Sequence, residues 1–149
     1  MNMRDAMKIQ LIEMVPFAKS IGVVLTDMGD GTAEGTLELR PDLMNHIQTM
    51  HAGVMYSLGE TVSGAAMTGA FADQILGLTP VAAEASIQYT KKAKGGLRAT
   101  GKTDQSGETL RALVEKDGKA RFRVTVTFFD ETDAEVGNMN VEWAIRKNG

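Results

Sequence analysis

A long run of small and apolar residues with a single carboxylate in its middle most constrains how this 149-residue chain can fold. Between residues 54 and 72, Glu60 is the only charged residue. Val54, Leu58 and Val62 follow a helical spacing, which predicts a largely buried helix. A lone carboxylate in such a helix is costly unless it is paired, hydrogen-bonded or held neutral. Glu60 is therefore the first candidate for chemistry.

Glycines recur along the same predicted helix, at Gly59, Gly64 and Gly69. Each one weakens an isolated helix by roughly 1 kcal/mol relative to alanine. So many glycines need a tertiary reason, and we expect the helix to pack closely against a curved sheet.

The segments on either side of this helix predict one more helix and a set of strands. Residues 3–19 carry apolar residues at helical spacing, and Pro16 should end or bend that helix. Two strands that meet at the turn of residues 29–31 should precede the central helix. After residue 79 we expect strands only, four or five of them. Residues 109–116 and 119–129 should pair around Asp117-Gly118, a strong hairpin signal.

This order predicts an α+β fold in which one largely antiparallel sheet packs against one long central helix. The connection through the helix should separate the second and third strands in the sheet. We expect a single domain over residues 1–149, because the chain has the length of one domain and shows no repeat or linker.

Composition excludes several classes of function. The net charge of −3 argues against a general nucleic-acid binder. The absence of cysteine excludes a thiolate nucleophile and a cysteine zinc site. No apolar run approaches the length of a membrane span, and charges interrupt any signal-peptide core, so we expect no membrane partner and a cytoplasmic location.

Residues of the central segment resemble the N…HGG…L.D/E pattern of hotdog-fold acyl-CoA thioesterases, of the phenylacetate-pathway and 4-hydroxybenzoyl-CoA thioesterase type. These residues are Asn45, the run His51-Ala52-Gly53, Leu58 and Glu60. The segment ASIQYTKKAKGG at 85–96 and the order of the elements match as well, so the resemblance covers roughly residues 15–147. Ala52 replaces the usual glycine, and Glu60 replaces the usual aspartate of the phenylacetate type.

The resemblance implies a hotdog fold, in which an antiparallel β-sheet wraps around a long central α-helix, and a thioesterase that releases a carboxylic acid and free coenzyme A. Glu60 would act as general base or nucleophile, and the Gly53 N–H would stabilise the oxyanion. Asn45 would orient the lytic water or the thioester carbonyl, His51 would help hold the thioester, and Ser63 would supply a supporting hydroxyl.

Coenzyme A would enter as part of the acyl-CoA substrate, so we expect no separate cofactor and no metal. A basic cluster suits the phosphates of its nucleotide: Lys91, Lys92, Lys94 and Arg98. Gly53 and Glu60 lie seven residues apart, about 10 Å along a helix, which is long for one compact site. We therefore expect an obligate homodimer whose chains share two active sites, either alone or paired into a homotetramer.

Other readings of the same residues stay open. The chain could be a non-catalytic module that binds acyl-CoA or another acyl thioester, or a hotdog dehydratase. His51 could use its ring only as a local hydrogen-bond partner at the start of the helix, and Asn45 could be an ordinary loop residue. The lysines could form no more than a solvated turn. The spacing of His46, His51 and Glu60 does not match a helical metal motif.

Overall fold

In the computed structural model, which describes residues 2–149, the strands form one six-stranded antiparallel sheet. The strands are β1 (Val24–Gly29), β2 (Thr32–Leu37), β3 (Leu78–Tyr89), β4 (Leu97–Thr103), β5 (Lys119–Asp130) and β6 (Glu135–Lys147). Their order across the sheet is β1-β2-β4-β5-β6-β3. The chain thus leaves β2 near one edge and returns as β3 at the opposite edge, which confirms the predicted separation of the second and third strands.

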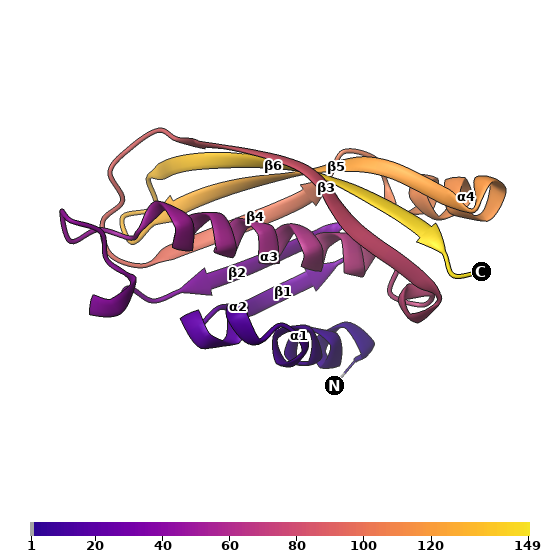
Figure 1. Cartoon of the computed structure of the whole chain (residues 1–149), viewed down its shortest axis with the longest axis horizontal. Helices are drawn as coiled ribbons and strands as arrows, with labels where there is room; N and C mark the ends of the chain where they lie inside the picture. The colour runs from indigo at the N-terminus through magenta and orange to yellow at the C-terminus, as the bar shows by residue number, and fades with distance from the viewer. Residues whose placement is uncertain (1) are drawn as a thin grey trace.

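Helices lie against the sheet and at its ends. They are α1 (Met3–Met14), α2 (Pro16–Ile21), α3 (Ala52–Ala70) and α4 (Gly107–Asp117), with short 3-10 turns η1 (Pro41–Leu43) and η2 (Ile75–Gly77). In Figure 1, α3 crosses the sheet and α1 and α2 run near β1. Pro16 ends the first helix, as predicted, and begins the second. None of the helices in residues 2–149 has both the length and the apolar character that a membrane span requires.

The central helix α3 is the core around which the sheet curves. Leu58, Val62 and Ala65 are fully buried on it. A Cβ atom at Gly59 would lie 2.5 Å from Cζ of Phe128 and 2.6 Å from the sulfur of Met139. The absence of a side chain at Gly59 therefore lets α3 approach β5 and β6, which confirms close packing against the sheet for this glycine.

The prediction of a strand over residues 109–116 was wrong, because residues 107–117 form α4. Ser106 caps this helix, and its Oγ accepts a hydrogen bond from the Thr109 N–H at 3.1 Å. Serine is among the preferred residues at this position because its short side chain satisfies an N–H that the helix leaves free.

The Asp117-Gly118 hairpin was wrong for a related reason. Gly118 takes the positive φ of 74° that was expected of it, but it ends α4 instead of turning between two strands, and its N–H bonds the Val114 carbonyl at 2.8 Å. Leu110 and Val114 lie four residues apart and are both buried. That helical spacing, with its serine start and glycine end, outweighs the hairpin signal.

Candidate functional site

Glu60 stands on α3 at the wall of a groove of about 480 Å³. The carboxylate is only partly exposed, and burial raises the pKa of the Glu60 carboxyl above its ordinary value. Within residues 2–149 it has no ion-pair partner. The expectation of a lone carboxylate in an apolar setting is thus confirmed, and the group is poised to take up a proton more readily than an exposed glutamate.

The rest of the groove is mainly apolar and comes from four parts of the chain. It is lined by Met7, Gln10, Leu11, Met14, Val15, Glu60, Thr61, Gly64, Met67, Thr68, Ile75, Leu76, Leu78, Pro80 and Trp143. The helix α1 supplies Met7, Leu11 and Met14 to one wall. Leu76, on the turn η2, is 91% exposed. Methionine and leucine walls suit a flexible apolar ligand, because methionine adapts its shape at little cost.

His51 is the N-cap of α3 and makes a hydrogen bond with the residue proposed as oxyanion donor. Its Nδ1 atom accepts the Gly53 N–H at 2.8 Å. Because Nδ1 acts as the acceptor, a neutral ring must carry its proton on Nε2, which faces away from this bond as a potential donor. The structure therefore brings His51 and Gly53 together. Their contact is a hydrogen bond in which the imidazole already accepts the Gly53 N–H.

Asn45 stabilises the loop before α3 through both the oxygen and the nitrogen of its side-chain amide. Its Oδ1 accepts hydrogen bonds from the N–H groups of Ile47 and Thr49, at 3.1 and 3.0 Å. Its Nδ2 donates to the Thr49 hydroxyl at 2.8 Å and to the Met50 carbonyl at 3.4 Å. The last of these bonds is the longest, so it is the one that a ligand could replace most easily.

Ser63 lies one turn beyond Glu60 and is fully buried. Its hydroxyl donates to the Glu60 backbone carbonyl at 2.7 Å and accepts from the indole Nε1 of Trp143 at 3.1 Å. The Ser63 hydroxyl thereby fixes the orientation of Trp143, whose ring forms part of the groove next to Glu60.

The predicted basic cluster divides into two parts. Lys91, Lys92 and Lys94 are exposed on the loop between β3 and β4. Arg98 instead lies on β4, where it pairs with Glu34 and Asp133, both at 3.5 Å. It also lies 4.4 Å from the centre of the Phe129 ring. Its charge is therefore largely compensated, while the three lysines have no carboxylate partner within residues 2–149.

Tyr89 was not singled out from the sequence, yet it links the lysine loop to the start of α3. Its hydroxyl donates to the Ala52 carbonyl at 3.0 Å. Burial, with a smaller contribution from the neighbouring Tyr56, raises the pKa of the Tyr89 phenol. The strand pattern gave no signal for this contact, because alternation predicts the face of a side chain but not what it meets there. Tyr89 brings the beginning of the lysine loop close to His51 and Gly53.

The structure thus gathers Asn45, His51 and Gly53 at one end of α3, while Glu60 and Ser63 lie about two turns along it. No three His, Asp or Glu side chains among residues 2–149 converge in the way that a metal site requires.

A family model described as a domain of unknown function, DUF4442, matches residues 4–145. Among curated proteins, no sequence matches the chain.

Solved structures are similar over nearly the whole chain. A protein from Pseudomonas aeruginosa, named a probable thioesterase, has a TM-score of 0.83 at 20% identity, covering 97% of this chain and 95% of that one. The PaaI protein of the E. coli phenylacetic acid degradation operon has a TM-score of 0.73 at 18% identity, with coverage of 98% and 94%. A thioesterase from Staphylococcus aureus has a TM-score of 0.72 at 15% identity, with coverage of 89% and 99%. These similarities confirm the predicted hotdog fold.

Proposed function

Because the chain belongs to the DUF4442 family and has the hotdog fold, we propose that it is an acyl-CoA thioesterase. It hydrolyses an acyl or aryl thioester to a carboxylic acid and free coenzyme A. The observation that carries this proposal is Glu60, a carboxylate with a raised pKa at the wall of an apolar groove and with no ion pair among residues 2–149. The thioesterase names of several structural neighbours support the same reaction class.

In the proposed reaction Glu60 starts the attack on the thioester carbon in one of two ways. As general base, it takes a proton from a water molecule whose oxygen bonds to that carbon. As nucleophile, its own oxygen bonds to the carbon and forms an anhydride, which water then opens. In both routes the C–S bond breaks and the sulfur leaves as coenzyme A thiolate, which takes up a proton. A raised pKa favours the first route, since a base works best when its pKa lies closer to the working pH.

The developing oxyanion is stabilised by the Gly53 N–H, which has the positive end of the α3 dipole behind it. In the absence of substrate this N–H is bonded to His51 Nδ1. We infer that the thioester oxygen takes the place of the imidazole, and that the displaced ring then donates its Nε2–H to the substrate. Asn45 holds the loop in position and can direct its Nδ2 to the lytic water by giving up its 3.4 Å bond to Met50.

The distance between Gly53 and Glu60 supports a dimer with shared sites. They lie seven residues apart on one helix, about 10 Å, so a single thioester meets both groups only if Glu60 comes from a partner chain. The strand β3 supports this assembly, because its 12 residues occupy an edge of the sheet. Its side chains include Val81, 55% exposed, and Tyr89, 50% exposed. An exposed edge strand of this length is a ready template for a second copy.

The nucleotide end of coenzyme A is assigned to the exposed lysines Lys91, Lys92 and Lys94. Their loop begins next to Tyr89, which contacts the start of α3 through Ala52. Arg98 contributes less, because its charge is shared with Glu34 and Asp133. The proposal needs no metal and no organic cofactor besides the substrate itself.

Release of free thiol from short, medium, long and aromatic acyl-CoAs tests the proposal. Wild type should hydrolyse at least one class, and Glu60→Gln should lower kcat/KM by roughly 100-fold or more. Glu108→Gln, an exposed change in the first turn of α4, is the matched control and should leave the rate unchanged. Binding of acyl-CoA without hydrolysis would instead favour the acyl-binding module, and retention of most of the rate by Glu60→Gln would exclude the mechanism.

A further inference from the structure

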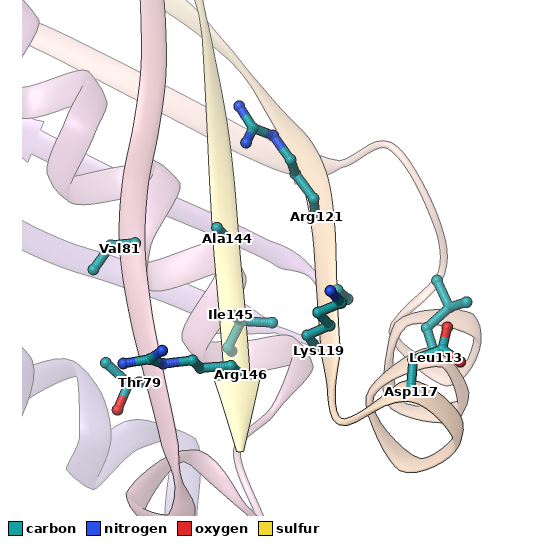
Figure 2. Close-up of a pocket in the computed structure, with 10 residues that line it drawn as sticks. Thr79, Val81, Leu113, Asp117, Lys119, Arg121, Ala144, Ile145 and Arg146 are labelled. Atoms are coloured by element: carbon teal, nitrogen blue, oxygen red, sulfur yellow. The ribbon is translucent and has the colours of Figure 1, made fainter. Parts of the chain in front are cut away.

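A second cleft, of about 670 Å³, lies on the face of the sheet that points away from α3 (Figure 2). Its lining comes from β3, β5, β6 and α4: Thr79, Val81, Leu113, Asp117, Lys119, Ala120, Arg121, Ala144, Ile145 and Arg146. Trp143 is buried and bonds Ser63 of α3, so along β6 the alternating residues Ala144 and Arg146 must point to the outer face. The cleft is therefore separated from the Glu60 groove by the sheet itself.

The register of the strands places the lining side chains in two rows. In the first row Arg146 pairs with Thr79 on β3 and with Lys119 on β5. Arg146 and Lys119 are thus directly opposite each other with the same charge, an arrangement that destabilises a sheet. Positive charge therefore gathers at this place although the chain carries a net charge of −3, and such a place attracts anions.

The ion pairs of the structure compensate only part of the positive charge in this cleft. Arg121, in the second row, pairs with Glu142 at 2.9 Å. By contrast, neither Lys119 nor Arg146 has an ion pair within residues 2–149, and Asp117 is the only carboxylate in the lining. Figure 2 shows the Arg146 side chain extended toward Thr79 on β3, away from Lys119 on β5, so the guanidinium must rotate back over β6 to meet an anion beside Lys119. An oxyanion placed between Lys119 and Arg146 would supply the missing charge, and arginine binds such groups through two parallel hydrogen bonds.

The second row supplies an apolar surface beside the charges. Ala144 pairs with Val81 on one side and with Arg121 on the other. The small side chain of Ala144 leaves a hollow, and Val81 borders it with 55% of its surface exposed. Leu113 of α4 adds a further apolar group to the lining. The apolar part of a ligand can therefore lie next to its charged part.

We propose that this cleft binds a small amphiphilic anion, with its carboxylate or phosphate between Lys119 and Arg146 and its apolar body on Val81 and Ala144. The volume of the cleft falls in the range of small-molecule sites. In the proposed dimer, pairing of β3 would extend the wall at Thr79 and Val81 and leave the two cations open to the ligand. The site is independent of thioester hydrolysis.

Titration of the ¹⁵N-labelled protein with benzoate and with phenyl phosphate tests the site by NMR. We expect saturable amide shifts at residues 79, 81, 119–121 and 144–146. The aryl anion that binds more tightly identifies the preferred head group. Inorganic phosphate, which has the head alone, and benzyl alcohol, which has the body alone, should bind at least roughly 10-fold more weakly, since each lacks half of the contacts.

Three variants separate charge from shape. Lys119→Gln combined with Arg146→Gln should weaken binding at least roughly 10-fold, because the head group loses both charges. Lys102→Gln, on the outer face of β4, is the matched control and should bind as wild type does. Ala144→Leu keeps all the charges but fills the hollow, so it should weaken the aryl ligands and leave inorganic phosphate unchanged.

Several outcomes would overturn the proposal. One is the absence of saturable shifts at these residues with both aryl anions. Another is equal binding by inorganic phosphate and phenyl phosphate, which would mark the cations as a nonspecific counter-ion surface. Unchanged binding by a folded Lys119→Gln, Arg146→Gln variant would also exclude it. Displacement of the aryl anions by free coenzyme A would also contradict the proposal. It would show that the cleft binds the nucleotide of the proposed substrate and is not a separate site.

Discussion

The Nδ1 atom of His51 accepts a hydrogen bond from the Gly53 N–H at 2.8 Å, so one side chain both caps the central helix and covers the proposed oxyanion donor. The same bond therefore serves stability in the free protein and must break when a thioester binds. Since N-cap bonds are worth about 1 kcal/mol, a substrate can replace the imidazole without unravelling α3, provided that its own oxygen accepts the same N–H.

Replacement of His51 by alanine should lower the free energy of unfolding by about 1 kcal/mol, because Gly53 loses its acceptor. His51→Asn should restore most of that loss, because asparagine is a preferred N-cap residue. Urea denaturation of the three proteins measures both effects. If His51→Ala unfolds at the same urea concentration as wild type, the imidazole does not cap α3 in solution.

The raised pKa of Glu60 predicts how stability depends on pH. Burial favours the protonated carboxyl in the folded chain, so the folded state binds the proton more tightly than the unfolded state does. Below the ordinary glutamate pKa both states are protonated and the penalty is absent. The penalty appears as the pH rises past that value and is complete above the folded pKa. Glu60→Gln, which cannot ionise, should therefore be more stable than wild type at neutral pH but not in acid.

Unfolding curves of wild type and Glu60→Gln at several pH values check this sign. The difference in the free energy of unfolding between the two proteins should grow as the pH rises and should then stay constant. A difference that stays the same at every pH would mean that Glu60 titrates with its ordinary pKa, and the observation that supports general-base catalysis would be lost.

Sequence patterns predicted the parts of this fold that depend on long periodic segments. The central helix was expected because Leu58 and Val62 repeat with helical spacing over an uncharged run, and it forms over residues 52–70. The helix α4 was missed because its 11 residues are short and end in Asp117-Gly118, which also fits a hairpin. A glycine at this position takes positive φ both at the end of a helix and in a hairpin. Only the tertiary packing of Leu110 and Val114 therefore decides between helix and hairpin.

The candidate site could be predicted only in part, for a different physical reason. Residue types and spacing pointed to Glu60, Gly53 and His51, but spacing could not show that the His51 ring would bond Gly53. Contacts between segments that lie far apart in the sequence could not be predicted from it. The hydroxyl of Tyr89 meets Ala52 across 37 positions of the chain, and the pairing of Lys119 with Arg146 follows from strand register, which single-strand alternation does not determine.

A methyl group at Gly59 should destabilise the protein even though alanine is the better helix former. Helix propensity alone would favour Gly59→Ala by roughly 1 kcal/mol. The new Cβ would, however, lie 2.5 Å from Phe128 and 2.6 Å from Met139, and such overpacking costs roughly 1 to 3 kcal/mol. We therefore expect a lower midpoint of thermal unfolding.

Gly64→Ala is the matched control on the same helix. Its Cβ would lie 3.4 Å from the Trp143 ring, an ordinary contact, so the gain in helix propensity should raise stability or leave it unchanged. Equal effects of the two substitutions would show that helix propensity, and not contact with β5 and β6, governs the glycines of α3.

Two lysines on the exposed edge of β3 should separate the proposed dimer. Ser86 and Gln88 lie on the exposed edge strand, and lysine at such positions opposes pairing with another strand. In a two-fold arrangement each substitution acts twice, because both copies present the same edge. Ser86→Lys with Gln88→Lys should therefore sediment as a monomer and lose thioesterase activity, since Glu60 of the partner no longer reaches Gly53. Thr100→Lys, on the interior strand β4, adds positive charge away from the edge and should keep both the assembly and the rate. A monomeric double variant that remains fully active would refute the shared site, because it would place the complete catalytic set within one chain.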